Sequence, residues 1–277
     1  KGQVLTVQPP QGLLYGAAPV ALVGSSDSGL PVTFEVLEGP GKIEGGKLAG
    51  TGAGVVKLRA RQAGNDEYAS AEKSFEVLMG KGTQEITWAD VPSKTYGDAA
   101  FDVSASSSSA LSVGYEVVSG PATIEGAKVT LSGAGTVVLR AKQGGNDNWN
   151  GAAALKSLEV VKAAQVITFG YLAGREFTSE PIQLGASSSS GLSVVYEVMK
   201  GEATVFGDEL TLTGVGEVTV RAKHLGTANY LAASAVDRTF TVSQGAQSVE
   251  IVVGEQISWQ SDPVEVGLKS SSGLKAF

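Results

Sequence analysis

The sequence predicts an all-β fold in which several β-sandwich domains follow one another along the chain. Three observations carry this prediction. The sequence repeats itself with a period near 80 residues, two segments of every complete copy alternate between apolar and polar residues, and glycine-rich turns separate short apolar runs.

The internal repeat is marked by a glutamine that opens each copy. Gln3, Gln84, Gln165 and Gln247 are separated by 81 (84 − 3), 81 (165 − 84) and 82 (247 − 165) residues. The strings GLPVTFEV, ALSVGYEV and GLSVVYEV keep the same spacing. A period of this length is too long for helical solenoid repeats and long enough for each copy to hold its own core, so it predicts tandem domains.

Strict alternation identifies the strands within each copy. In the segment GAGTVVLRA, Val137, Leu139 and Ala141 lie on one face and the residues between them on the other. This period of two is typical of half-buried strands. Turns such as Gly126-Ala127 join the strands as two-residue hairpins do. About seven strands per copy predict a β-sandwich of the immunoglobulin type.

We place domain boundaries between consecutive copies and expect linkers at 79–83, 162–164 and 243–246. The predicted domains are repeat 1 at 1–82, repeat 2 at 83–163, repeat 3 at 164–245 and the first part of a fourth repeat at 246–277. Short linkers between sandwiches predict a rod. The partial fourth repeat leaves two alternatives open: a truncated piece, or a segment completed by another chain through strand addition.

The linked motifs resemble a known domain family. Q-x-I-T-[WF], a serine-rich loop, GL-x-V-x-YEV, GPATI, G-A-G-x-V-x-[VL]-RA and GN-x-x-[YW] together look like the bacterial immunoglobulin-like repeats called MBG domains. The resemblance covers the whole chain, although the first repeat departs in its opening strand and the third has Gly201-Glu202 where the second has Gly-Pro. It implies a multi-repeat secreted or cell-surface protein of bacteria, and no particular ligand.

Composition argues against several partners. The net charge is −7, with 21 basic residues dispersed among 28 acidic ones, so we expect no nucleic-acid partner. No apolar run approaches the roughly 20 residues that a membrane-spanning helix needs, and we expect no membrane insertion in this segment. Cysteine is absent, which excludes disulfides and thiolate metal sites.

A search for catalytic or cofactor-binding residues leaves none. The single histidine, His224, occupies a position that the sister repeats fill with Gln62 and Gln143, so we expect neither a catalytic base nor a metal ligand there. The loop acids Asp66, Asp147 and Asp208 leave calcium open, but no dense run of carboxylates supports it. The serine runs at 106–109, 187–190 and 270–272 are interpreted as loop tips. The sequence therefore predicts no enzyme, no metal site and no bound cofactor.

Two sets of residues are candidates for a site. A glutamate on the polar face of one predicted strand recurs opposite an arginine of the neighbouring strand, which predicts three cross-strand ion pairs. The predicted pairs are Glu35 with Arg59, Glu116 with Arg140, and Glu197 with Arg221. Trp149, in the loop GGNDNWNG, is the candidate ligand platform, because a tryptophan exposed on a loop can stack on a sugar ring. Trp88 and Trp259 have large equivalents in the other copies and are expected to pack inside domains.

These observations favour a structural stalk or spacer of a bacterial cell-surface or secreted protein. The expected partners are the flanking domains of the same polypeptide. An adhesin-like protein is the expected context. Two alternatives stay open: an extracellular filament subunit assembled by strand complementation between copies, and an accessory array that binds carbohydrate. The expected location is extracellular or on the bacterial cell surface.

Overall fold

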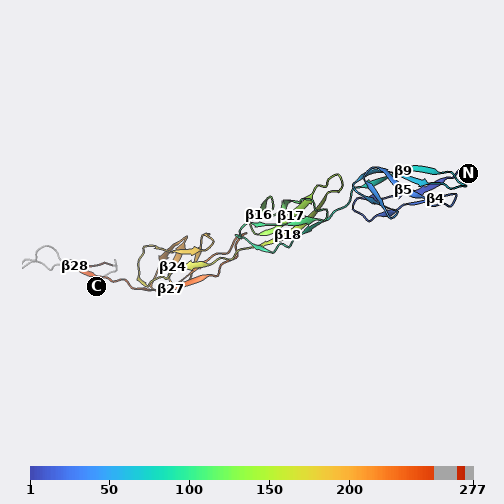
Figure 1. The fold of residues 1–277 in the computed structure, drawn as a ribbon. Coiled ribbons are helices and arrows are strands. Elements are labelled where there is room, and N and C mark those ends of the chain that lie inside the picture. The colour runs from blue at the N-terminus through green and yellow to red at the C-terminus, as the bar shows by residue number, and fades with distance from the viewer. Residues whose placement is uncertain (253–266, 272–277) are drawn as a thin grey trace, which may run out of the picture. The chain divides into compact units, whose positions relative to one another are not determined.

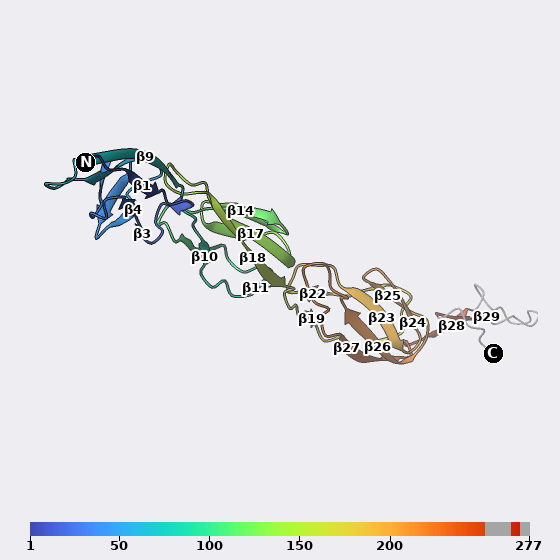
Figure 2. The same ribbon diagram turned by 90° about the vertical axis from the view of Figure 1, so that its right-hand side faces the viewer.

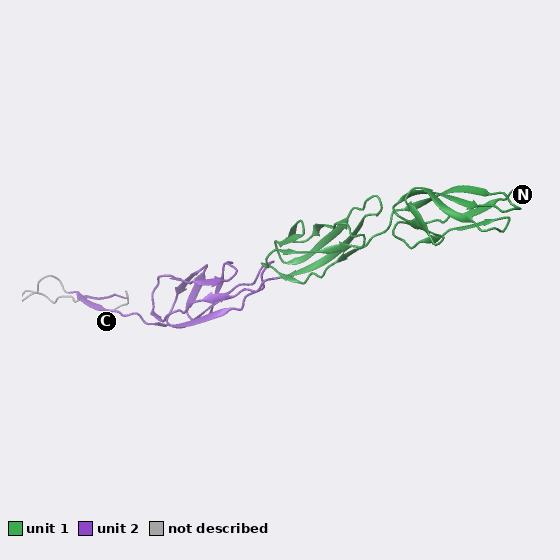
Figure 3. Cartoon of the chain, in the orientation of Figure 1, with its two compact units in different colours: residues 1–161 green, residues 162–277 purple. Residues whose placement is uncertain are grey.

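The computed structural model describes residues 1–252 and 267–271. The chain divides into two compact units, residues 1–161 and 162–277 (Figure 3). The first unit holds the predicted repeats 1 and 2, and the second holds repeat 3 with the described part of the fourth. Trp259 and most of the predicted fourth repeat lie outside the described residues.

Every regular element of the described residues is a β-strand (Figure 1). Repeat 1 contains β1 (Leu5–Gln8), β2 (Leu13–Leu14), β3 (Val20–Ala21), β4 (Val23–Ser26), β5 (Thr33–Glu38), β6 (Gly41–Glu44), β7 (Lys47–Gly50), β8 (Gly54–Gln62) and β9 (Ala71–Gly80). Repeat 2 contains β10 (Ile86–Trp88), β11 (Lys94–Thr95), β12 (Phe101–Asp102), β13 (Ala105–Ser107), β14 (Gly114–Ser119), β15 (Ala122–Glu125), β16 (Lys128–Leu131), β17 (Gly135–Gln143) and β18 (Ala152–Val161).

Repeat 3 has the same sequence of elements. They are β19 (Ile167–Phe169), β20 (Arg175–Glu176), β21 (Ile182–Gln183), β22 (Ala186–Ser188), β23 (Val195–Lys200), β24 (Ala203–Phe206), β25 (Glu209–Leu212), β26 (Gly216–Lys223) and β27 (Val236–Ser243). Beyond it, β28 (Val249–Val252) pairs with β29 (Gly267–Ser270) in an antiparallel ladder. No helix long and apolar enough to cross a membrane occurs in the part of the chain that is described.

Each repeat is a sandwich with one connectivity. In repeat 2 a four-stranded sheet has the order β11-β18-β17-β14 (Figure 2). The facing layer is built from β12-β16-β15 and β10-β13. Repeats 1 and 3 reproduce these orders strand for strand. The predicted fold class, tandem immunoglobulin-like β-sandwiches, is confirmed. The nine strands per repeat correspond to the predicted seven, because the first two strands of the sandwich are each interrupted.

The interruption of the first strand has a local cause. In repeat 1, Pro9, Pro10 and Gly12 separate β1 from β2, and proline cannot donate to a sheet ladder. The chain uses this break to change layers. β1 pairs antiparallel with β4, whereas β2 pairs parallel with β9 in the other sheet. The same switch recurs in repeats 2 and 3.

Each repeat has its own apolar core between the two layers. The alternation predicted around Leu139 is confirmed, since Val137, Leu139 and Ala141 of β17 are fully buried. Three separate clusters form, one in each repeat. Met79, which the sequence placed in a linker, is instead 2% exposed and belongs to the core of repeat 1, because β9 extends to Gly80.

Candidate functional site

The predicted glutamate–arginine partners face each other in register in all three repeats. In repeat 1, Arg59 Nε lies 2.5 Å from Glu35 Oε1. In repeat 2, Arg140 Nη1 lies 2.8 Å from Glu116 Oε1, and Lys142 binds the other carboxylate oxygen at 2.5 Å. The hydrogen bond from Lys142, helped by the nearby positive charges, lowers the pKa of Glu116.

Repeat 3 rearranges these charges. Arg221 is bidentate to Asp237, with Nε–Oδ1 and Nη2–Oδ2 distances of 2.8 and 2.9 Å, and Glu197 pairs with Lys223 instead. The sequence missed this exchange because Asp237 stands where repeat 2 has Leu155 opposite Arg140 and so offers Arg221 a second carboxylate. Lys223 lowers the pKa of Glu197, and Arg221 lowers the pKa of Asp237. These groups are solvated ion pairs on the outer face of the sheet.

A second feature, which we call the glutamine node, was not predicted. In repeat 2 it consists of Gln84, Ser107, Ser109 and Gln143. Gln84 is only 8% exposed, and all hydrogen-bonding positions of its amide are used. Its Nε2 donates to Gln143 Oε1 and to the carbonyl of Asn150 at 2.6 Å, while its Oε1 accepts from both serine hydroxyls. The node ties the opening strand to two loops at one end of the sandwich.

The glutamine node recurs in the other repeats with one change of chemistry. Repeat 1 builds it from Gln3, Ser26, Ser28 and Gln62. Repeat 3 uses Gln165, Ser188, Ser190 and His224. The Nδ1 atom of His224 lies 2.9 Å from Gln165 Nε2 and accepts from the Gly226 amide at 3.0 Å, so it replaces the glutamine Oε1 of the other two copies.

The node also corrects the interpretation of the serine runs as loop tips. Ser107 is 9% exposed, and both Ser107 and Ser109 are engaged by Gln84. A signal was present in the sequence: the opening glutamine and the two serines recur together in all three repeats, and the second glutamine recurs in repeats 1 and 2. Finding the node from that signal requires knowing that the two loops meet at the opening strand.

Trp149 lies where repeat 2 meets repeat 1. Its ring packs edge to face against Tyr15, with ring centroids 5.1 Å apart. Gly16 has a φ of +78°, and a Cβ atom there would lie 2.7 Å from Cη2 of the indole. A Cβ at Gly82 would lie 2.6 Å from Cζ3. The indole therefore packs against backbone on two sides, and its role as a ligand platform stays a prediction.

The loop around Trp149 also hydrogen-bonds the linker and repeat 1. The Gly82 amide donates to Asn148 O and the Asn150 amide donates to Gly82 O, both at 2.9 Å. Asn148 Oδ1 accepts from the amide of Ala53 in repeat 1 at 2.9 Å. We call residues 146–150 with Gly82, Tyr15 and Gly16 the junction. Because Asn150 also accepts from Gln84, the glutamine node supports the junction from the side of repeat 2.

Repeat 3 also forms hydrogen bonds with the linker that precedes it. The Ala163 amide donates to Asn229 O, the Leu231 amide donates to Ala163 O, both at 2.9 Å, and Lys162 Nζ donates to Thr227 O at 2.8 Å. Both Gly82, before repeat 2, and Ala163, before repeat 3, are thus hydrogen-bonded to a loop of the repeat that follows them.

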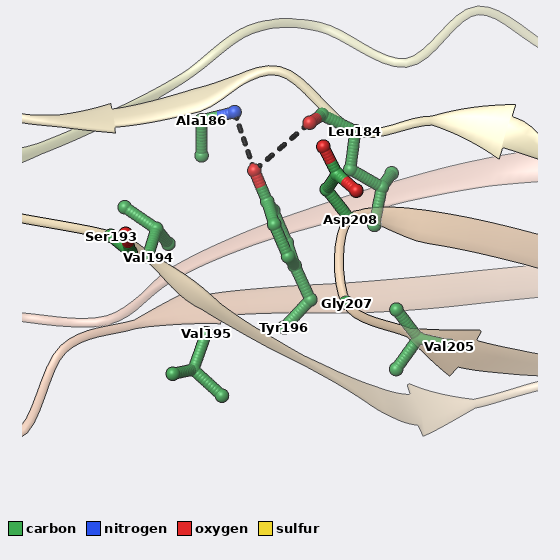
Figure 4. A pocket seen from close by; sticks show the side chains of 9 residues that line it. All are labelled: Leu184, Ala186, Ser193, Val194, Val195, Tyr196, Val205, Gly207 and Asp208. Atoms are coloured by element: carbon green, nitrogen blue, oxygen red, sulfur yellow. Dashed lines mark hydrogen bonds between the residues drawn. The ribbon is translucent and has the colours of Figure 1, made fainter.

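A pocket of repeat 3 with a volume of about 440 Å³ lies between β23 and the hairpin of β24 and β25. Tyr196 stands at its centre, and its hydroxyl accepts from the Ala186 amide at 2.7 Å and donates to Leu184 O at 3.1 Å (Figure 4). Ser193 and Asp208 lie on opposite sides of the tyrosine ring in this view. The other lining residues are Val194, Val195, Val205 and Gly207.

The described residues offer little for metal binding. Asp66, Asp147 and Asp208 belong to three different repeats, and no group of three or more histidine or carboxylate side chains gathers in the described part of the chain. Calcium binding by these loop acids stays a prediction.

No protein-family model and no curated protein sequence matches this chain. Among solved structures, the chain is similar to domains 1–6 of the surface layer protein SbsC, at 14% identity over 90% of this chain and 41% of that one, with a TM-score of 0.30. An I-band fragment of titin is 13% identical over 87% of this chain and 98% of its own, with a TM-score of 0.32. A Bacteroides ovatus protein of a mixed-linkage glucan utilization locus, in complex with a heptasaccharide, is 13% identical over 93% and 75%, with a TM-score of 0.20.

The chain spans about two-fifths of the length of the SbsC structure. Identities and TM-scores this low carry no functional inference to this chain. Its fold follows from its own strand orders and cores.

Proposed function

We propose that this chain is a non-catalytic structural spacer, whose tandem sandwiches hold the parts of a larger polypeptide at a set separation. The observation that carries the proposal is the junction. A flexible linker would leave Gly82 solvated, whereas here its amide and carbonyl are both bonded to the loop that carries Trp149. A spacer needs this feature, because free tumbling at the linkers would make the separation variable.

The repetition of the same structural roles supports the proposal. The residues that recur in three copies build cores, glutamine nodes and turns, and their side chains are occupied by packing or by hydrogen bonds within each repeat. The ion pairs hold their carboxylates in the charged form through neighbouring cations, which suits surface solubility rather than proton transfer.

The cellular context is part of the proposal. The motif resemblance to MBG repeats, the absence of cysteine and the net charge of −7 fit a secreted or cell-surface protein of bacteria. An adhesin-like protein with this segment as its stalk is the context we favour. No contact among the described residues favours a filament or an oligosaccharide at Trp149 over this function.

The proposal can be tested by measuring the distribution of distances between repeats 1 and 2. Spin labels at Glu44 and Glu125, both exposed, would report it by pulsed electron paramagnetic resonance. We expect a narrow distribution for the wild-type chain and a clearly broader one for Trp149→Ala combined with Asn148→Ala. Tyr68→Ala, at the equivalent position of repeat 1, is the matched control and should leave the distribution unchanged. A wild-type distribution as broad as that of the double variant would contradict a spacer.

A further inference from the structure

Several residues in and around the pocket of repeat 3 differ from their equivalents in repeat 2. The hairpin of β24 and β25 reads Phe-Gly-Asp-Glu, whereas the equivalent hairpin of repeat 2 reads Glu-Gly-Ala-Lys. The two charged side chains of the repeat 2 hairpin cancel, whereas Asp208 and Glu209 give the repeat 3 hairpin two negative charges. Val195, which lines the pocket, replaces Gly114 of repeat 2.

The polar side chains of the pocket are Tyr196, Ser193 and Asp208, and the charge among them is negative. The Tyr196 hydroxyl donates its proton to Leu184 O, so it has no proton to donate to a ligand. No hydrogen bond or ion pair within the described part of the chain engages the carboxylate of Asp208, which is the one charged group among the lining residues. The Asp208 carboxylate accepts hydrogen bonds only, so a ligand that brings a positively charged donor is favoured here.

The remaining walls suit an alkyl chain. Val194 and Val205 pack against the core of repeat 3 and form the apolar walls, whereas the side chain of Val195 points to the other side of β23 (Figure 4). Phe206, on the outer face of the same hairpin, is 88% exposed and stands beside Glu209 in the strand register. A side chain with methylene groups and a terminal cation matches both the apolar walls and the carboxylate, as long cationic side chains commonly do.

We propose that this pocket binds the side chain of a lysine in a basic segment of a partner protein. The methylene groups lie against Val194 and Val205, the ammonium group donates to Asp208, and the flanking residues of the segment contact Phe206 and Glu209. Charge complementarity argues against a second copy of this chain as the partner, because each copy carries a net charge of −7. The proposal is independent of the spacer function, which does not use this pocket.

A blocked pentapeptide, Gly-Gly-Lys-Gly-Gly, is the probe, and the same peptide with acetyl-lysine is its neutral counterpart. We expect the lysine peptide to shift the nuclear magnetic resonance signals of Val194, Val195 and Val205 in the full chain, with saturation at millimolar concentration, and added salt to weaken it. Asp208→Asn should weaken binding by about tenfold, as expected for the loss of a hydrogen bond to a charged group. Equal responses to both peptides, or shifts that map outside the pocket, would overturn the proposal.

Exchanging the hairpins between repeats separates loss of binding from loss of folding. The triple change Phe206→Glu, Asp208→Ala and Glu209→Lys gives repeat 3 a hairpin that repeat 2 already tolerates, and it should abolish the response. The reverse set, Gly114→Val, Glu125→Phe, Ala127→Asp and Lys128→Glu, should create a second site in repeat 2. The proposal is wrong if the nuclear magnetic resonance spectrum shows that the triple variant of repeat 3 is folded and the variant still binds the lysine peptide.

Discussion

Repeats 2 and 3 share one fold and differ in what they place on its surface. Both bury the equivalent residues of the long central strand, Leu139 in one and Val220 in the other, with no exposure to solvent. Both close one end of the sandwich with a glutamine node, yet repeat 3 uses His224 as the acceptor where repeat 2 uses Gln143. The comparison shows that the fold constrains which positions are buried and which hydrogen-bonding roles are filled, and leaves the residue type and its volume free, as Leu158 and Phe240, both buried at equivalent positions, also show.

Repeats 2 and 3 also differ in the residues that they expose. Repeat 2 presents Glu125 at its hairpin and Trp149 at the junction, whereas repeat 3 presents Phe206 and a pocket with Asp208. Exposed positions have diverged in charge, whereas buried positions stay apolar even where Phe240 of repeat 3 replaces Leu158 of repeat 2. The strand order is the same in both repeats, so these surface differences need no change in connectivity.

The largest effect is expected in the core of repeat 2. Leu139→Ala removes a fully buried side chain and should lower the stability of this repeat by about 2–5 kcal/mol. Leu139→Val, the residue type that repeat 3 uses at this position, should cost clearly less. Denaturant unfolding followed by segment-resolved hydrogen exchange measures both. If repeat 1 loses protection to the same extent as repeat 2, the repeats do not unfold as separate units.

The second-largest loss of stability is expected from a change in the glutamine node. Gln84→Leu leaves the buried Ser107 hydroxyl, the partly buried Ser109 hydroxyl and the Asn150 carbonyl without their partner, which should cost about 1–3 kcal/mol and loosen the loop that carries Trp149. Faster hydrogen exchange at Gly145 and Asn150 is the measurement. His224→Gln is the matched control in repeat 3. It restores the acceptor used in the other copies, so we expect it to be nearly neutral, and a loss as large as that of Gln84→Leu would contradict the equivalence of the two acceptors.

The smallest effect is expected from the ion pairs on the outer sheet face. The folded-state pKa of Glu116 is lowered, chiefly by the hydrogen bond from Lys142, so the stabilisation it gives is present at neutral pH. It is lost as the pH falls from about 4.5, the ordinary value, through the lowered value. Glu116→Gln should thus reduce stability slightly at pH 7 and have no effect in acid or at high salt. Thermal melts at the two pH values test this, and an equal loss at both would show that packing, and not charge, is responsible.

The sequence by itself determined the repeat, the strands and the cross-strand register. The period of about 81 residues and the alternation around Leu139 are local patterns, and a two-residue period places successive side chains on opposite faces whatever lies nearby. The same regularity predicted which glutamate would face which arginine in the ladder.

Only the tertiary structure decided which partner each polar group takes. Arg221 binds Asp237 rather than Glu197 because a third strand brings a better-placed carboxylate. Trp149 packs on Tyr15, 134 residues earlier (149 − 15), and His224 accepts from Gln165 across the end of the sandwich. These choices depend on distances between segments far apart in the chain. Such distances are fixed when the layers close around the core, and no local pattern encodes them.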